Sequence, residues 1–161
     1  MSATQVRASI LGVVSATLLL ANAEGAEEPQ REARTTMSSL PAAVRRTAVE
    51  QSKGATVVAI TREADEGQTV YEVAMKRNGR SRDIIIGLDG TVLIAEDEVR
   101  MAELPAGVRA TLEKHAGAGR ILRIETVRQR GRLAYYEAQL RSGKRISELK
   151  IGLAGKVLPA E

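Results

Sequence analysis

His115 is the single histidine of this 161-residue chain and the residue best suited to acid–base chemistry near neutral pH. Together with Glu113 or Glu125 it would give a hydrolase a general base. The chain has no cysteine and no second histidine, and no serine lies in a recognisable nucleophile turn. We therefore expect His115 to lie at a helix end, where the helix dipole favours it, in a protein that is not an enzyme. The hydrolase stays as the alternative.

The densest group of carboxylates is Glu96-Asp97-Glu98. It lacks the glycine and the ligand spacing of a calcium loop, so we interpret residues 96–103 as a short solvated linker and expect no metal. The glycines fall where turns and helix ends require them, and none of them forms a phosphate-binding loop. We expect no cofactor.

Basic residues are concentrated in the second half of the chain. Residues 104–161 carry 12 basic and 5 acidic side chains, whereas residues 40–103 carry 9 and 11. The sequence predicts a basic hairpin patch formed by Arg128, Arg130, Arg132, Arg141, Lys144 and Arg145. Nucleic acid is disfavoured because no aromatic stacking surface accompanies these residues. Attraction to an anionic envelope or an acidic protein, pairing with the more acidic first half, and a purely solubilising role remain open.

The first residues have the pattern of an export signal. Arg7 precedes an apolar run over 8–21, and small residues lie near Ala23, so we predict a signal peptide over 1–23 that is cleaved after Ala23. The alternative is a retained N-terminal anchor. Residues 24–39 contain little to bury and are expected to be a flexible leader. These features predict a periplasmic or secreted protein with no transmembrane segment after cleavage.

An internal repeat organises the rest of the chain. At an offset of 64 residues, LPAAVR at 40–45 matches LPAGVR at 104–109, and at an offset of 65, IGLDGTVL at 86–93 matches IGLAGKVL at 151–158. Apolar residues first recur at helical spacing, as Leu40, Val44 and Ala48 do, and then alternate as in strands. Asn78-Gly79 favours a two-residue hairpin turn.

These patterns predict an α+β protein made of two tandem helix-plus-antiparallel-sheet (α-β-β-β) repeats, over residues 40–99 and 104–161. Each helix covers one face of its sheet, and the other face is open. Short fourth strands are expected at 91–95 and 156–158. The core is aliphatic, because aromatic residues make up 2% of the chain.

The repeated Leu-Pro-Ala-x-Val-Arg, the Tyr-Glu-Val at 71–73 and the Ile-Gly-Leu-Asp-Gly-x-Val-Leu at 86–93 resemble the PepSY and PepSY-like family, here in tandem over 40–158. The arrangement is also similar to that of the beta-lactamase inhibitory protein. The resemblance implies an export-associated, non-catalytic module, of a kind found beside peptidases as an inhibitory propeptide unit. It supplies no catalytic motif.

The open sheet face is the predicted binding surface. Alternation places nine residues on it: Arg123, Glu125, Tyr135, Glu137, Gln139, Lys150, Val70, Glu72 and Ile85. Val57, Val70 and Ile85 make the first unit's face apolar, which gives it a reason to be covered. We expect a protein or peptide partner, such as an exported peptidase. The alternative is that this face packs against the leader, the other unit or a second copy, in an envelope scaffold with no separate client.

Overall fold

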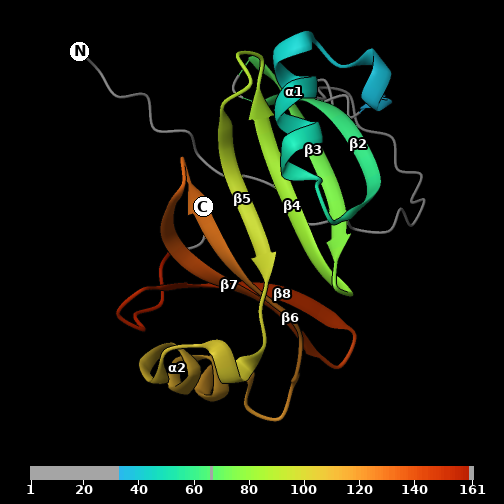
Figure 1. Ribbon diagram of the computed structural model, residues 1–161. Helices are drawn as coiled ribbons and strands as arrows, with labels where there is room; N and C mark the ends of the chain where they lie inside the picture. Colours follow the sequence, from blue (N-terminus) through green and yellow to red (C-terminus); the bar gives the residue numbers. More distant parts are fainter. Residues whose placement is uncertain (1–32, 66, 160–161) are drawn as a thin grey trace, which may run out of the picture.

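The computed structural model describes residues 33–65 and 67–159, and within them the strands form one antiparallel sheet. The strands lie side by side in chain order, from β1 to β8 (Figure 1). Their bounds are β1 Ala33–Arg34, β2 Thr56–Asp65, β3 Gln68–Arg77, β4 Arg80–Gly87, β5 Val92–Glu98, β6 Arg120–Gln129, β7 Arg132–Ser142 and β8 Arg145–Gly152.

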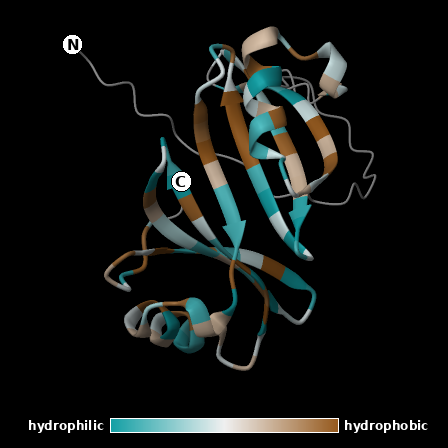
Figure 2. Ribbon diagram, in the orientation of Figure 1, coloured by the Kyte–Doolittle hydropathy of each residue, from teal (hydrophilic) through white to brown (hydrophobic). Residues whose placement is uncertain are grey.

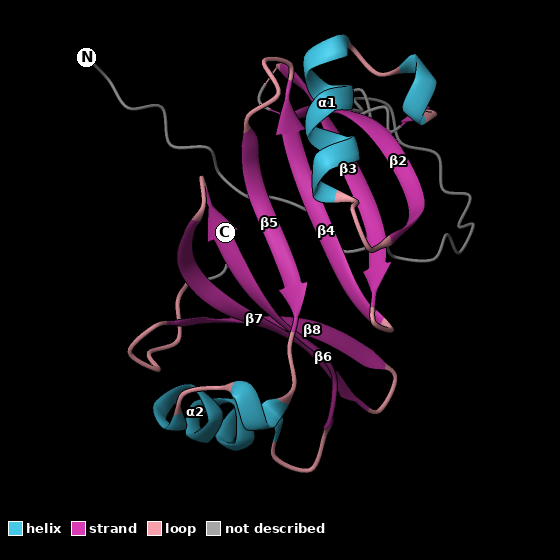
Figure 3. Ribbon diagram, in the orientation of Figure 1, coloured by secondary structure: helices cyan, strands magenta, loops and turns pink. Residues whose placement is uncertain are grey.

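Within residues 33–65 and 67–159, two α-helices and two 3₁₀ turns accompany the sheet (Figure 3). The helices are α1 Ala42–Gln51 and α2 Ala106–Ala116, and the 3₁₀ turns are η1 Met37–Ser39 and η2 Met101–Glu103. A proline directly precedes each α-helix, where its missing N–H is not needed. Gly117, with φ near +50°, ends α2 and donates its N–H to the Glu113 carbonyl.

The predicted fold class, two tandem helix-plus-antiparallel-sheet repeats, is wrong. The chain does not form two separate helix-plus-sheet repeats, because β5 pairs with β4 on one side and with β6 on the other, and so joins all strands into one eight-stranded sheet. Residues 91–95 were expected to be a short fourth strand. Residues 92–95 instead begin a central strand that continues to Glu98, and its pairing with β4 and β6 satisfies backbone groups on both sides. With two short helices, the α+β class fits only loosely.

Both helices lie on the same face of the sheet. Neighbouring cross-strand partners share a face, and one row runs from Met75 through Arg82, Asp97, Thr126 and Tyr136 to Ile151. Met75 belongs to the core beneath α1, and Ile151 to the core beneath α2. Figure 2 shows hydrophobic residues on the strands that α1 covers, and hydrophilic residues at the ends of β4 and β5 nearest the second half.

Each helix also contacts a turn of the sheet directly. The Thr47 hydroxyl donates to the Gly90 carbonyl oxygen at 2.7 Å, and the Thr111 hydroxyl donates to the Gly155 carbonyl oxygen at 2.6 Å. A Cβ atom on Gly155 would lie 2.7 Å from the Gly107 carbonyl carbon. Helix and turn therefore approach too closely for any side chain at this position.

Two β-bulges change which residues face the core. They lie between Val57 and Ala59 in β2 and between Ile121 and Arg123 in β6. As a result Val58 and Leu122 are 63% and 37% exposed, although alternation alone predicts that both face inward. Val57, expected on the open face, packs instead against the core beneath α1.

The predicted leader is structured where it is described. Ala33 and Arg34 pair with β2, and Met37 packs against the core beneath α1. The predicted signal peptide, its cleavage site and the first part of the leader lie outside the described residues.

Candidate functional site on the open face of the sheet

The open face is the side of the sheet opposite α1 and α2. In its second half, Glu125 pairs with Glu137, which pairs with Lys150, and Arg123 pairs with Gln139. The structure thus brings these predicted residues together across β6, β7 and β8, and Lys150 lies over the Tyr135 ring at 5.5 Å. Glu72 lies further along the same face, opposite Ile85.

The apolar part of this face is closed rather than exposed. Val70 and Ile85 are buried in a third core with Ile94, Val127 and Tyr135. The last two residues come from the second half of the chain, so the molecule covers its own apolar surface. Val70, Ile85 and Tyr135 are therefore buried and not exposed partner contacts. For these three residues the structure agrees with the alternative, in which the open face packs against the other unit.

Three carboxyl groups converge beside this third core. Asp83 in β4 pairs directly with Glu96 in β5, and Glu125 lies on the same face in β6. One carboxylate oxygen from each residue lies within 4.8 Å of the other two. Glu125 is 4% exposed, and the other two residues are half-buried. We call Asp83, Glu96 and Glu125 the carboxylate cluster.

Burial raises the pKa of every member of the cluster, and repulsion between members adds to this effect for Glu96 and Glu125. Desolvation, followed by the charge of Glu125, raises the pKa of Glu96 to about 8. Desolvation raises the pKa of Glu125 to about 7, against the opposing effect of Arg123. The pKa of Asp83 is raised by desolvation as well. The cluster therefore holds protons at pH values where exposed carboxylates have lost them.

Arg123 is the nearest cation to the cluster, but its geometry is poor. Its Nε lies 3.2 Å from Oε1 of Glu125, yet both atoms are buried without a hydrogen-bond partner in the described part of the chain. The Glu125 side chain is therefore close to a positive charge without accepting a hydrogen bond from it on that oxygen.

The sequence interpretation missed Asp83 and Glu96 as site residues. Glu96-Asp97-Glu98 was expected to be a solvated linker, but it is the end of β5, with Glu96 and Glu98 on the open face and Asp97 on the helix-covered face. The alternation of Glu96 and Glu98 was the available signal. It could not be interpreted without knowing that β6 pairs with these residues.

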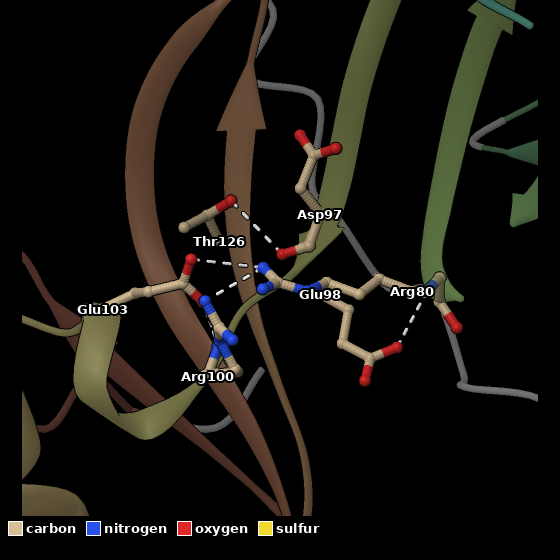
Figure 4. A network of polar contacts seen from close by, with 7 residues as sticks. Arg80, Asp97, Glu98, Arg100, Glu103 and Thr126 are labelled. Carbon is tan, nitrogen blue, oxygen red and sulfur yellow. Dashed lines mark hydrogen bonds and ion pairs between the residues drawn. The ribbon is translucent and has the colours of Figure 1, made fainter. Parts of the chain in front are cut away.

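Residues 98–103 are also held by a polar network at the junction of the two halves (Figure 4). Arg80 donates to the Glu103 carboxylate at 3.0 Å, and the backbone N–H of Ser81 donates to Glu98 at 2.8 Å. The backbone N–H of Arg100, followed by the Arg80 side chain, lowers the pKa of Glu103 to about 2. The connection between β5 and α2 is therefore structured by hydrogen bonds rather than freely solvated.

The predicted basic patch is two separate groups. Arg128, Arg130 and Arg132 lie at the β6–β7 turn, whereas Arg141, Lys144 and Arg145 lie at the β7–β8 turn. The strand β7 has 11 residues between these turns, which is a length of roughly 35 Å. A partner that docks at one of these turns would therefore not contact the basic residues at the other turn.

A pair of arginines lies on the open face near the β7–β8 turn. Arg120 in β6 is the direct cross-strand partner of Arg141 in β7, and Arg141 is the partner of Ile146 in β8. All three residues are exposed, Ile146 by 49%. Neither arginine is ion-paired within the described residues. We call Arg120, Arg141 and Ile146 the arginine row.

The structure separates His115 from one of its two candidate partners in the alternative hydrolase site. His115 is exposed on the last turn of α2, and its Nδ1 lies 2.8 Å from the Thr111 carbonyl oxygen. Glu113 is exposed on the same helix, whereas Glu125 is buried on the opposite face of the sheet. The sheet therefore separates His115 from Glu125.

No protein-family model and no curated protein sequence matches this chain. Solved structures do share its fold. One is described as a periplasmic protein from Bacteroides eggerthii, with a TM-score of 0.62 at 15% identity, covering 74% of this chain and 86% of that chain. A DUF2874 family protein from Bacteroides uniformis has a TM-score of 0.59 at 13% identity, with 74% and 86% coverage.

A BLIP-like protein from Bacteroides fragilis has a TM-score of 0.53 at 17% identity, covering 73% of this chain and 82% of that chain. The fold is thus BLIP-like, as the sequence resemblance implies. Over 33–65 and 67–159, the chain has no helix of the length and apolarity needed to span a bilayer.

Proposed function

We propose that this protein is an exported, non-catalytic binding module, related to the PepSY-like family, that docks a protein with an acidic surface through the arginine row. The single observation that carries the proposal is the exposed pair Arg120 and Arg141, directly opposite each other and without an acidic partner in the described chain.

The arrangement of this pair favours binding over a purely solubilising role. Like charges directly opposite each other on a sheet destabilise it, and a carboxylate from a partner would relieve this repulsion. Arginine also presents a planar group that binds carboxylates through two hydrogen bonds. Ile146 adds an exposed apolar contact beside the pair, and 12 basic against 5 acidic residues in 104–161 attract an acidic surface.

The location of this function is outside the cytoplasm. The apolar run over 8–21, with its flanking Arg7 and small residues, supports export, and the description of a fold neighbour as periplasmic is consistent with it. In this setting the partner is an exported protein. An inhibitory role toward a peptidase is one form that such binding would take.

The absence of catalysis is part of the same proposal. It is supported by the exposed position of His115 and by its separation from Glu125. The variant His115→Gln is expected to fold normally and to change no function of the protein. Loss of a measured hydrolytic activity in this variant would contradict the proposal.

Partner capture by charge reversal tests the docking surface. The bait proteins are wild type, Arg120→Glu/Arg141→Glu, and the control Arg128→Glu/Arg132→Glu, whose exposed arginines flank the other end of β7. An envelope protein captured by wild type is identified, purified and titrated against all three. We expect the first variant to lose affinity at least tenfold and the control to lose much less.

Higher salt should weaken the wild-type complex, because the contact is between exposed charges. Equal affinity of both double variants for the identified partner would exclude the arginine row as the docking surface. Capture of no partner by any bait would favour the scaffold alternative.

A further inference from the structure

We propose that Asp83, Glu96 and Glu125 form a binding site for a divalent cation of calcium size. This inference is independent of the proposed docking function, because it concerns another part of the open face. It begins from the convergence of three carboxylates from three neighbouring strands, each with one oxygen within 4.8 Å of the other two.

A second observation points to a ligand at this place. The Glu125 side chain is 6% exposed, and its Oε1 has no hydrogen-bond partner in the described residues, even though Arg123 lies 3.2 Å away. A buried carboxylate oxygen without a hydrogen bond is costly, and the nearby Arg123 does not supply that bond. The Glu125 carboxylate lies within the cluster, and a bound cation would satisfy it.

The charges around the cluster match a divalent cation. When the three carboxylates are ionised, Arg123 neutralises one of them, and two negative charges remain. Two further carboxylates, Glu98 and Glu137, lie near enough to repel the cluster. Two lysines offset them: Lys76 lies near Asp83, and Lys150 is the cross-strand partner of Glu137. The charges of these four residues cancel, so a cation of charge two balances the two remaining negative charges of the cluster.

The ligand type and number favour calcium. Carboxylate oxygens are hard ligands that suit Ca²⁺ and Mg²⁺. Mg²⁺ keeps several waters and is usually held by one or two carboxylates, whereas Ca²⁺ accepts more carboxylate ligands in a flexible geometry. Three convergent carboxylates therefore suit Ca²⁺ better than Mg²⁺. With three protein residues supplying oxygens and water completing the shell, we expect a dissociation constant of roughly 0.1–1 mM, as in extracellular calcium modules.

Calorimetric titration of chelator-treated protein tests the site. CaCl₂ and MgCl₂ are titrated into wild type near pH 8, where competition with protons is reduced. The variants are Glu125→Gln, Glu96→Gln and Asp83→Asn, each of nearly unchanged shape. The matched control is Glu148→Gln, an exposed carboxylate in β8. Circular dichroism verifies that each variant folds.

We expect Ca²⁺ to bind with 1:1 stoichiometry and several-fold more tightly than Mg²⁺. Each cluster variant that folds should weaken Ca²⁺ binding at least tenfold, and Glu148→Gln should change it less than twofold. Binding of Ca²⁺ should also raise the melting temperature of wild type and not that of the cluster variants.

Three results would overturn the proposal. They are the absence of binding heat and of a thermal shift up to about 20 mM Ca²⁺, an unchanged affinity in the folded cluster variants, and equal affinity for the two cations. If all three substitutions unfold the protein, NMR chemical-shift changes of wild type on addition of Ca²⁺ decide, since they should be confined to residues around Asp83, Glu96 and Glu125.

Discussion

The helix-covered face of the sheet buries only hydrophobic side chains in the described chain, whereas the open face buries a carboxylate beside its apolar core. Glu125 on the open face is the one charged residue among those buried over the described chain. Burial of the apolar side chains on both faces gains free energy by removing apolar area from water. Burial of the Glu125 carboxylate costs free energy, because the charge is desolvated. This difference indicates that the carboxylate cluster, unlike the apolar cores, is kept for a reason other than stability.

The largest expected loss of stability comes from a cavity on the helix-covered face. Leu112 is fully buried between α2 and the sheet. Leu112→Ala should lower the free energy of unfolding by roughly 2–5 kcal/mol, because a cavity adds to the lost transfer energy. On the open face, Val127→Ala should cost about 2 kcal/mol, since fewer methyl groups are removed. Urea denaturation measures both. A larger loss of unfolding free energy in Val127→Ala than in Leu112→Ala would contradict the prediction that the helix-covered site contributes more to stability.

The next effect concerns the contact between helix and turn on the same face. Gly155 has φ of +81°, and a Cβ there would lie 2.7 Å from the Gly107 carbonyl carbon, so Gly155→Ala should destabilise the protein by roughly 2–4 kcal/mol. Gly131 has the same φ and no atom within 4 Å of its Cβ position. Gly131→Ala is therefore the control, with a cost of roughly 1 kcal/mol from backbone strain alone. Thermal denaturation yields the difference. Equal costs would show that helix and turn separate easily.

The smallest expected effect is a gain in stability rather than a loss, and it concerns the open face. The folded pKa of Glu96, about 8, exceeds its ordinary value of 4.5. The protonated carboxyl therefore favours the folded state, and this contribution is complete below about pH 4.5 and is lost as the pH rises through about 8. Above that range, with chelator present, Glu96→Gln should stabilise the protein by roughly 1–2 kcal/mol, because the repulsion is removed.

The pH dependence separates this effect from general stabilisation. The gain from Glu96→Gln should vanish near pH 4.5 and grow toward alkaline pH in urea denaturation series. The exposed Glu148→Gln in β8 is the control and should change little at any pH. A gain that is the same at all pH values would contradict the assignment of a raised pKa to Glu96.

Local pattern was sufficient for the elements and insufficient for their assembly. The spacing of Val44 and Ala48 predicted α1, and Asn78-Gly79 predicted the β3–β4 turn, where both residues have positive φ. The bulges that expose Val58 and Leu122 have no signal in the alternation. The burial of Val70 and Ile85 was expected only in the alternative where the open face packs against the other unit, because Tyr135, which shares their core, is far away in sequence.

The carboxylate cluster likewise depends on tertiary assembly that local sequence patterns do not predict. Asp83, Glu96 and Glu125 are 13 and 29 residues apart along the chain, and nothing local relates them. A run of acidic residues after a strand is typical of a solvated connection, which is how Glu96–Glu98 was interpreted. The pairing of β5 with β6 then places those carboxylates in the middle of a sheet.

The sequence by itself determined the two α-helices, the strands β2 to β4 and β6 to β8, and the two-residue turn at Asn78-Gly79, because these depend on residues only a few positions apart. The tertiary structure alone decided that β5 and β6 pair, that the two halves share one sheet, and that Glu125 is buried beside Asp83 and Glu96. The physical reason is that strand pairing uses backbone groups common to all residues, so the choice of partner strand depends on how the whole chain buries its apolar faces.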